Sequence, residues 1–97
     1  MGLVYDSAVS TGLFDPSDIK VRINPFVHYR TGNEDPTHSF IHVFAHIMEG
    51  RNVMQKKQLS KKIITALHAI FPSVPIISMN IQDFEKATYC NKSMLYH

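Results

Sequence analysis

The 97-residue sequence has one cysteine, little net charge and no long apolar run. The single cysteine, Cys90, excludes an internal disulfide and every metal motif that needs several cysteines, and it fits a reducing setting. No apolar run approaches the roughly 20 residues that a membrane-spanning helix requires, and the N-terminus lacks the pattern of a signal peptide. We therefore expect a soluble, cytoplasmic protein.

The charge pattern gives little support for a nucleic-acid partner. The formal net charge is +2 at pH 7 with histidine neutral. Nucleic-acid binders typically carry a dense basic face with aromatic platforms, whereas the basic residues here are spread out or confined to one face of a helix. That helical set comprises Lys56, Lys57, Lys61 and Lys62. Four lysines on a helix are more often a solvated face than a binding site.

Metal and nucleophilic chemistry also lack a motif. The sequence contains no Gly-rich phosphate loop and no Ser-His-Asp elbow. His42 and His46 have an H-x-x-x-H spacing, but on a strand four residues span roughly 13 Å. Because zinc–nitrogen bonds are about 2.1 Å long, the two rings cannot share an ion. We expect packing or interface histidines and no metal site.

Residues 39–84 show the clearest pattern, a strand, a tight turn, an amphipathic helix and a second strand. The first strand ends at Glu49, Gly50 to Asn52 form the turn, and the helix begins at Val53 with Asn52 and Gln55 at capping-box spacing. Its apolar stripe is Leu59, Ile63, Leu67 and Phe71, and Pro72 ends it. A strand pattern opens again at Pro75, so the segment predicts a parallel βαβ unit.

The first of these strands has two apolar faces. Ile41, Val43, Ala45 and Ile47 alternate with Phe40, His42, Phe44, His46 and Met48. Both faces of such a strand are expected to be covered. One helical layer covers a single face, so we expect an oligomer in which sheets pack together.

The N-terminal part predicts a helix end, a turn and an edge strand. Residues 3–10 read as the last turns of a helix that closes at Thr11-Gly12, and the turn DPSD follows Phe14. From Ile19 to Arg30 apolar and polar residues alternate, which predicts a strand. Pro25 cannot donate a ladder hydrogen bond, so this strand is expected at an edge or with a bulge. Residues 31–37 have the composition of a loop.

Three cations form the candidate binding site. Lys20 and Arg22 are expected on one polar face of the predicted strand, and Arg51 lies at the strand-to-helix turn beside a helix N-terminus, where anions are well received. Arginine presents a planar fork that holds carboxylates with two hydrogen bonds. From spacing alone, three solvated charges remain the alternative.

Residues 11–22 and 40–51 together resemble 5-carboxymethyl-2-hydroxymuconate isomerase of the tautomerase superfamily. The matching positions are Thr11 to Phe14, Ile19, Arg22, Phe40, His42, Ile47 and Gly50-Arg51, and the match continues through the helix and last strand to Asn91. The resemblance implies an α/β (two-layer α+β) fold of two tautomerase-like βαβ units. A helix would pack on one face of a mixed sheet, and the sheets would face inward in a trimer.

The resemblance also implies a cofactor-free isomerase of aromatic catabolism. Such enzymes move a proton within an unsaturated 2-oxo dicarboxylate. By position Arg51 would bind substrate, Lys20 stands where the family usually has arginine, and Phe14 would belong to an apolar wall. The family's base is an N-terminal proline on a strand that precedes the matched residues. We therefore expect a single domain, residues 1–97, truncated at its N-terminus, with no identifiable catalytic residue.

Two functions follow as hypotheses. The first is a trimeric isomerase that binds small unsaturated dicarboxylates through Arg51, with Lys20, Arg22 and Phe14 in support. The second is a catalytically inactive oligomeric module for binding or assembly that keeps the same fold.

Overall fold

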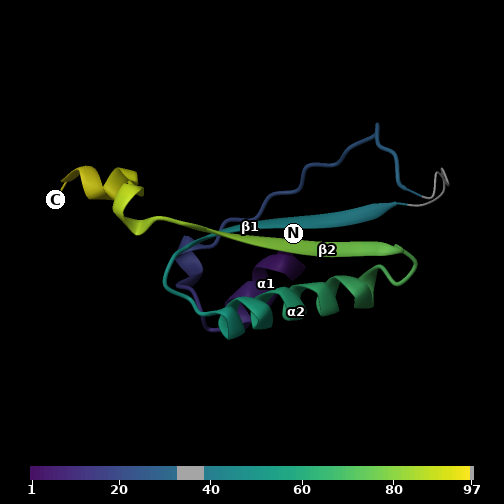
Figure 1. Ribbon diagram of the computed structural model, residues 1–97, viewed down its shortest axis with the longest axis horizontal. Coiled ribbons are helices and arrows are strands. Elements are labelled where there is room, and N and C mark those ends of the chain that lie inside the picture. Colours follow the sequence, from purple (N-terminus) through teal and green to yellow (C-terminus); the bar gives the residue numbers. More distant parts are fainter. Residues whose placement is uncertain (33–38, 97) are drawn as a thin grey trace.

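The computed structural model describes residues 1–32 and 39–96, which form two layers (Figure 1). The elements in chain order are α1 (Gly2–Ser10), η1 (Pro16–Asp18), β1 (Phe40–Met48), α2 (Val53–Ile70), β2 (Ile76–Phe84), η2 (Lys86–Thr88) and η3 (Lys92–Tyr96). β1 and β2 pair in parallel, from Phe40 opposite Ile76 to Met48 opposite Phe84. Both helices lie on one side of this sheet (Figure 1). The βαβ unit predicted for residues 39–84 is therefore confirmed.

The start of α2 is fixed by the predicted capping box. The side chain of Asn52 accepts a hydrogen bond from the backbone N–H of Gln55 at 2.8 Å, and the side chain of Gln55 accepts one from the backbone N–H of Asn52 at 2.9 Å. Gly50, two residues before the N-cap Asn52, has a φ of +122°. Residues other than glycine rarely adopt this backbone conformation. Gly50 thus lets the chain turn sharply from β1 into α2.

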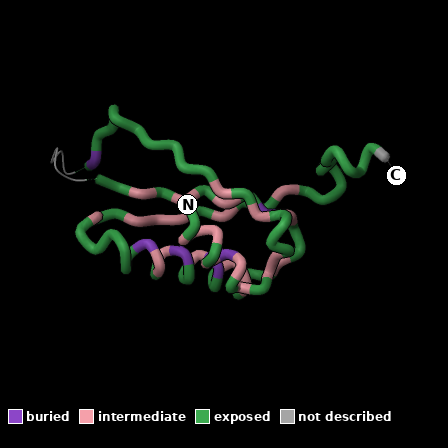
Figure 2. Tube along the Cα trace, turned by 180° about the vertical axis from the view of Figure 1, so that it is seen from behind, coloured by how far each residue is buried: buried purple, intermediate pink, exposed green. Residues whose placement is uncertain are grey.

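The core lies between the helices and the sheet. Its buried residues are Ala8 of α1 and Leu59, Ile63 and Leu67 of α2. Partly buried residues of the sheet pack against them, namely Ile41, Val43, Ile77, Met79 and Ile81. Figure 2 shows these buried positions on the helices, whereas exposed positions dominate the segment before β1 and the C-terminal tail. Three residues of the predicted stripe are confirmed as core, but Phe71, at the end of the helix, is 43% exposed.

The N-terminal helix and the turn after it also match their predictions. α1 ends at Ser10, and Gly12 has a φ of +70°, as expected for a glycine just beyond a helix end. The side chain of Asp15 accepts a hydrogen bond from the backbone N–H of Ser17, which begins the short η1 turn. Residues 33–37 of the predicted loop lie outside the described residues.

The strand predicted for residues 19–30 is wrong. Residues 20–31 belong to no helix or strand, and within the described part of the chain β1 pairs only with β2. A segment with an alternating pattern forms a strand only when a neighbouring strand pairs with its backbone N–H and C=O groups. The described sheet is therefore purely parallel rather than mixed, and it contains one βαβ unit rather than two. No helix among residues 1–32 and 39–96 is long and apolar enough to cross a membrane.

Candidate functional site

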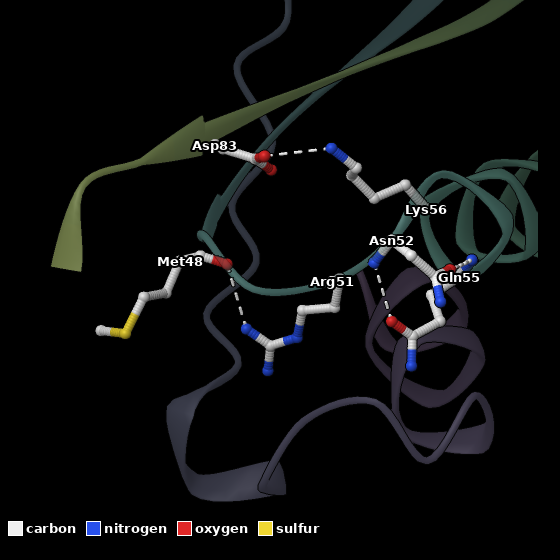
Figure 3. Close-up of polar contacts among 6 residues, drawn as sticks. All are labelled: Met48, Arg51, Asn52, Gln55, Lys56 and Asp83. Atoms are coloured by element: carbon white, nitrogen blue, oxygen red, sulfur yellow. Dashed lines mark hydrogen bonds and ion pairs between the residues drawn. The ribbon is translucent and has the colours of Figure 1, made fainter.

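Arg51 lies in the turn between β1 and α2, where two backbone carbonyls hold its guanidinium. Nη1 donates a hydrogen bond to the carbonyl oxygen of Met48 at 3.2 Å (Figure 3), and Nη2 donates one to the carbonyl oxygen of Leu13 at 2.8 Å. The guanidinium carbon lies 4.7 Å from the centre of the Phe14 ring, within the range of a cation–π contact. The structure thus brings two of the predicted site residues, Arg51 and Phe14, into direct contact.

This arrangement leaves part of the guanidinium available. A guanidinium has five N–H donors, and the two carbonyls occupy two of them. None of the carboxylates in the described part of the chain forms an ion pair with Arg51. The half-buried side chain is therefore a fixed cation with spare donors. It can bind a carboxylate without first giving up an internal ion pair.

Two of the carboxylates at this end of the sheet are engaged elsewhere. Asp83, near the end of β2, forms an ion pair of 3.0 Å with Lys56 in the first turn of α2 (Figure 3). Glu49 accepts a hydrogen bond from the backbone N–H of Lys86 at 2.7 Å. Both contacts keep these acidic groups from neutralising the guanidinium.

The other two predicted cations, Lys20 and Arg22, lie in the irregular segment that follows η1. Lys20 is exposed, and its ammonium group donates to the carbonyl oxygens of Ser17 and Asp18 at 3.5 and 3.3 Å. Arg22 is also exposed, in the irregular segment after η1. The expectation that both project from one strand face is wrong, because that strand does not form.

The capping box occupies part of the helix N-terminus beside Arg51. In the capping box, the backbone N–H of Gln55 donates to the side chain of Asn52, and the backbone N–H of Asn52 donates to the side chain of Gln55. A bound anion would have to compete with these bonds. The backbone N–H groups of Val53 and Met54 take no part in the capping box, so they can attract an anion at this turn together with the guanidinium.

The sequence matches the family model of 5-carboxymethyl-2-hydroxymuconate isomerase over residues 1–96. The chain belongs to this family. Membership places it among tautomerase-type isomerases of aromatic catabolism. A search of curated proteins found no match to the chain.

In this member of the 5-carboxymethyl-2-hydroxymuconate isomerase family, the sequence did not predict which groups hold Arg51, namely the carbonyls of Leu13 and Met48. Every residue has a carbonyl, so no sequence signal marks the two that hold Arg51. A shallow depression on the surface lies elsewhere, between the two helices, and is lined by Ser7, Gln58, Lys61, Lys62, Thr65, Ala66 and Ala69. Arg51 is not among its residues.

His42 contacts two neighbours on the sheet. His42 lies 2.6 Å from the hydroxyl oxygen of Ser78 through its Nδ1 atom, and its ring meets that of Phe44 edge to face at 4.4 Å. Within the described residues, no group of three or more histidine, cysteine or acidic side chains could hold a metal ion.

Proposed function

We propose that this chain is an isomerase of small unsaturated 2-oxo or 2-hydroxy dicarboxylates, similar to 5-carboxymethyl-2-hydroxymuconate delta-isomerase. It would move a proton within the substrate without a cofactor, in the cytoplasm, as a homotrimer. Arg51 binds one carboxylate, Phe14 provides an apolar wall, and Lys20 and Arg22 attract the dianionic substrate. The proposal assigns no residue as the base.

The observation that carries the proposal is the held guanidinium of Arg51. Its bonds to Leu13 and Met48 fix its orientation before a ligand arrives, so little side-chain entropy is lost on binding. A fixed cation also stabilises the negative charge that develops on a dienolate in the transition state. Phe14 lies against the same group and would exclude water from one side of it.

A second candidate function is a binding module without catalysis. The same two carbonyl bonds give Arg51 a structural task, because they join the turn after β1 to the loop after α1.

Turnover of a 2-hydroxymuconate-type dicarboxylate tests the proposal. Ketonisation is followed by absorbance for wild type, Arg51→Ala and Arg51→Lys, with Lys57→Ala as a control that removes an exposed cation from α2. We expect Arg51→Ala to lower kcat/KM by about a hundredfold or more, Arg51→Lys to recover part of it, and the control to match wild type.

The results separate the two candidates. Equal rates in wild type and Arg51→Ala would remove Arg51 from any role in the reaction. Binding of the dicarboxylate that depends on Arg51, with no turnover in wild type, would favour the binding module. Circular dichroism spectra of each variant show whether a lost rate merely reflects a lost fold.

A further inference from the structure

Among the described elements, no helix covers one face of the sheet. The odd-numbered residues Ile41, Val43, Ile77, Met79 and Ile81 pack against the helical core, and successive side chains of a strand point to opposite faces. The opposite side, which we call the open face, therefore carries the even-numbered residues of both strands. These are Phe40, His42, Phe44, His46, Met48, Ile76, Ser78, Asn80, Gln82 and Phe84. Phe44, at its centre, is 71% exposed.

The chain exposes more surface than a self-sufficient monomer of its size. Its accessible surface is 7723 Å², about 2,000 Å² more than is usual for a folded monomer of 11.1 kDa. Its radius of gyration of 15.8 Å also exceeds the roughly 12.5 Å expected for a compact domain of this length. A standard interface buries about 800 Å² on each partner, so the surplus is large enough for contact with another copy of the chain.

The chemistry of the open face suits a second copy of the chain. Its residues, all within the described part of the chain, include no lysine, arginine, aspartate or glutamate. A charged partner such as a nucleic acid or an anionic membrane would find no fixed charge to bind. Two copies of this uncharged, half-apolar face meet without electrostatic repulsion. This balance holds only while the two histidines of the face are neutral.

We propose that copies of this chain associate through the open face only while His42 and His46 are uncharged, so that acidification separates the subunits. The inference rests on the homotrimer of the proposed function and adds its regulation. Histidine is the side chain whose charge ordinarily changes between pH 5 and 8. In the assembly the two rings would be buried among Phe40, Phe44 and Met48. Burying two imidazolium ions there costs much more free energy than burying the two neutral rings.

The groups around the two histidines offer no compensating negative charge. The cross-strand neighbours on β2 are Ser78 opposite His42 and Gln82 opposite His46. Ser78 accepts a hydrogen bond from a protonated ring and can donate one to a neutral ring, so its contact with His42 does not select the charge state. Asp83 belongs to the other face and is paired with Lys56.

The remaining titratable groups near the open face are also accounted for. In the segment before β1, the ring of Tyr29 meets the ring of Phe40 at 5.4 Å, and His28 precedes it. At the other end, the ring of Tyr89 lies 5.2 Å from that of Phe84, and Glu49 is engaged by the backbone of Lys86. Glu85, the residue after β2, is exposed and makes no side-chain cap hydrogen bond. On the open face itself, β1 and β2 carry no carboxylate.

Sedimentation equilibrium between pH 8 and pH 5 tests this inference. For each histidine that must be neutral in the assembly, the association constant falls by up to about tenfold per pH unit once the free imidazole is protonated. We expect the dissociation constant of wild type to rise at least about tenfold between pH 7.5 and 5.5. The His42→Gln/His46→Gln variant should change by less than about threefold, and His68→Gln, on the exposed side of α2, should behave as wild type.

A permanent charge provides a second test. Phe44→Lys places on the open face the charge that acid would create, so it should be monomeric already at pH 7.5 while its circular dichroism spectrum stays folded. The inference is overturned if the double histidine variant separates at the same pH as wild type, or if Phe44→Lys assembles normally. A wild-type chain that is monomeric at pH 7.5 overturns it together with the trimer, whereas the turnover experiment judges the isomerase proposal independently.

Discussion

The guanidinium of Arg51 donates a hydrogen bond of 2.8 Å to the carbonyl oxygen of Leu13, a residue 38 positions earlier in the chain. This bond joins the loop that follows α1 to the turn between β1 and α2. It also places the ring of Phe14, the next residue, against the guanidinium. One side chain therefore organises the candidate site and ties the N-terminal helix to the βαβ unit.

Replacing Arg51 should destabilise the fold as well as the site. Arg51→Ala removes two charge-assisted hydrogen bonds and the contact with Phe14, so we expect the free energy of unfolding to fall by about 1–3 kcal/mol. Arg51→Lys keeps the charge but loses the planar fork, and should recover only part of this. Urea denaturation measures the difference. If Lys57→Ala, which removes an exposed cation, costs as much, the carbonyl bonds contribute nothing specific.

Shortening a side chain on the buried face of α2 should lower the free energy of unfolding. Leu59 is 2% exposed, and Leu59→Ala should lower the free energy of unfolding by about 2–5 kcal/mol, because it removes apolar contacts and leaves a cavity. Ile70, in the same helix, is 56% exposed, so Ile70→Ala should cost about 0.5 kcal/mol or less. Thermal or urea unfolding of both variants checks this. Similar losses for the two would contradict the assignment of the core.

The capping box at the start of α2 predicts a coupled pair of substitutions. Asn52→Ala removes an acceptor for the backbone N–H of Gln55 and should cost about 1 kcal/mol. Gln55→Ala removes the reciprocal bond and should cost less. Because each side chain positions the other, the double variant should lose less than the sum of the two. Gln58→Ala removes an amide from the same helix outside the box, and a loss equal to that of Asn52→Ala would contradict the capping role.

Asp15 should titrate below its usual range. The backbone N–H and the hydroxyl of Ser17 both donate to its carboxylate, at 3.0 and 2.8 Å, and they lower its pKa from the ordinary value of 3.8. Since the folded pKa is below the unfolded one, the ionised carboxylate favours the folded state above pH 3.8. That contribution is lost as the pH falls through the lowered pKa. NMR titration of the carboxyl carbon should show a higher pKa in Ser17→Ala, and no change there would exclude the hydroxyl as a cause.

The local features of the candidate site were predictable, but its assembly was not. The order of Gly50, Arg51 and Asn52 between an alternating run and a helical stripe predicted a cation at a strand-to-helix turn, and the structure has it there. The carbonyls that hold Arg51 come from Leu13 and Met48. Their identity depends on where the loop after α1 passes, which is a long-range property of the fold.

The segment from Ile19 to Arg30 shows why a pattern can mislead. Its alternation was sufficient to predict a strand and to place Lys20 and Arg22 on one face. A helix satisfies its backbone hydrogen bonds within itself, so the capping and apolar pattern of residues 52–70 determined α2 directly. A strand satisfies them only with a partner, and within the described residues β1 pairs with β2 alone.

The sequence by itself determined the order of strand, turn, helix and strand, most of the buried stripe of α2 and the position of Arg51 between β1 and α2, because each of these depends on residues close together in the chain. Only the tertiary structure decided that Phe14 and the Leu13 carbonyl meet Arg51, that the segment carrying Lys20 and Arg22 forms no strand, and that no described helix covers one face of the sheet. The physical reason is that these outcomes depend on contacts between segments far apart in the chain, which no local pattern encodes.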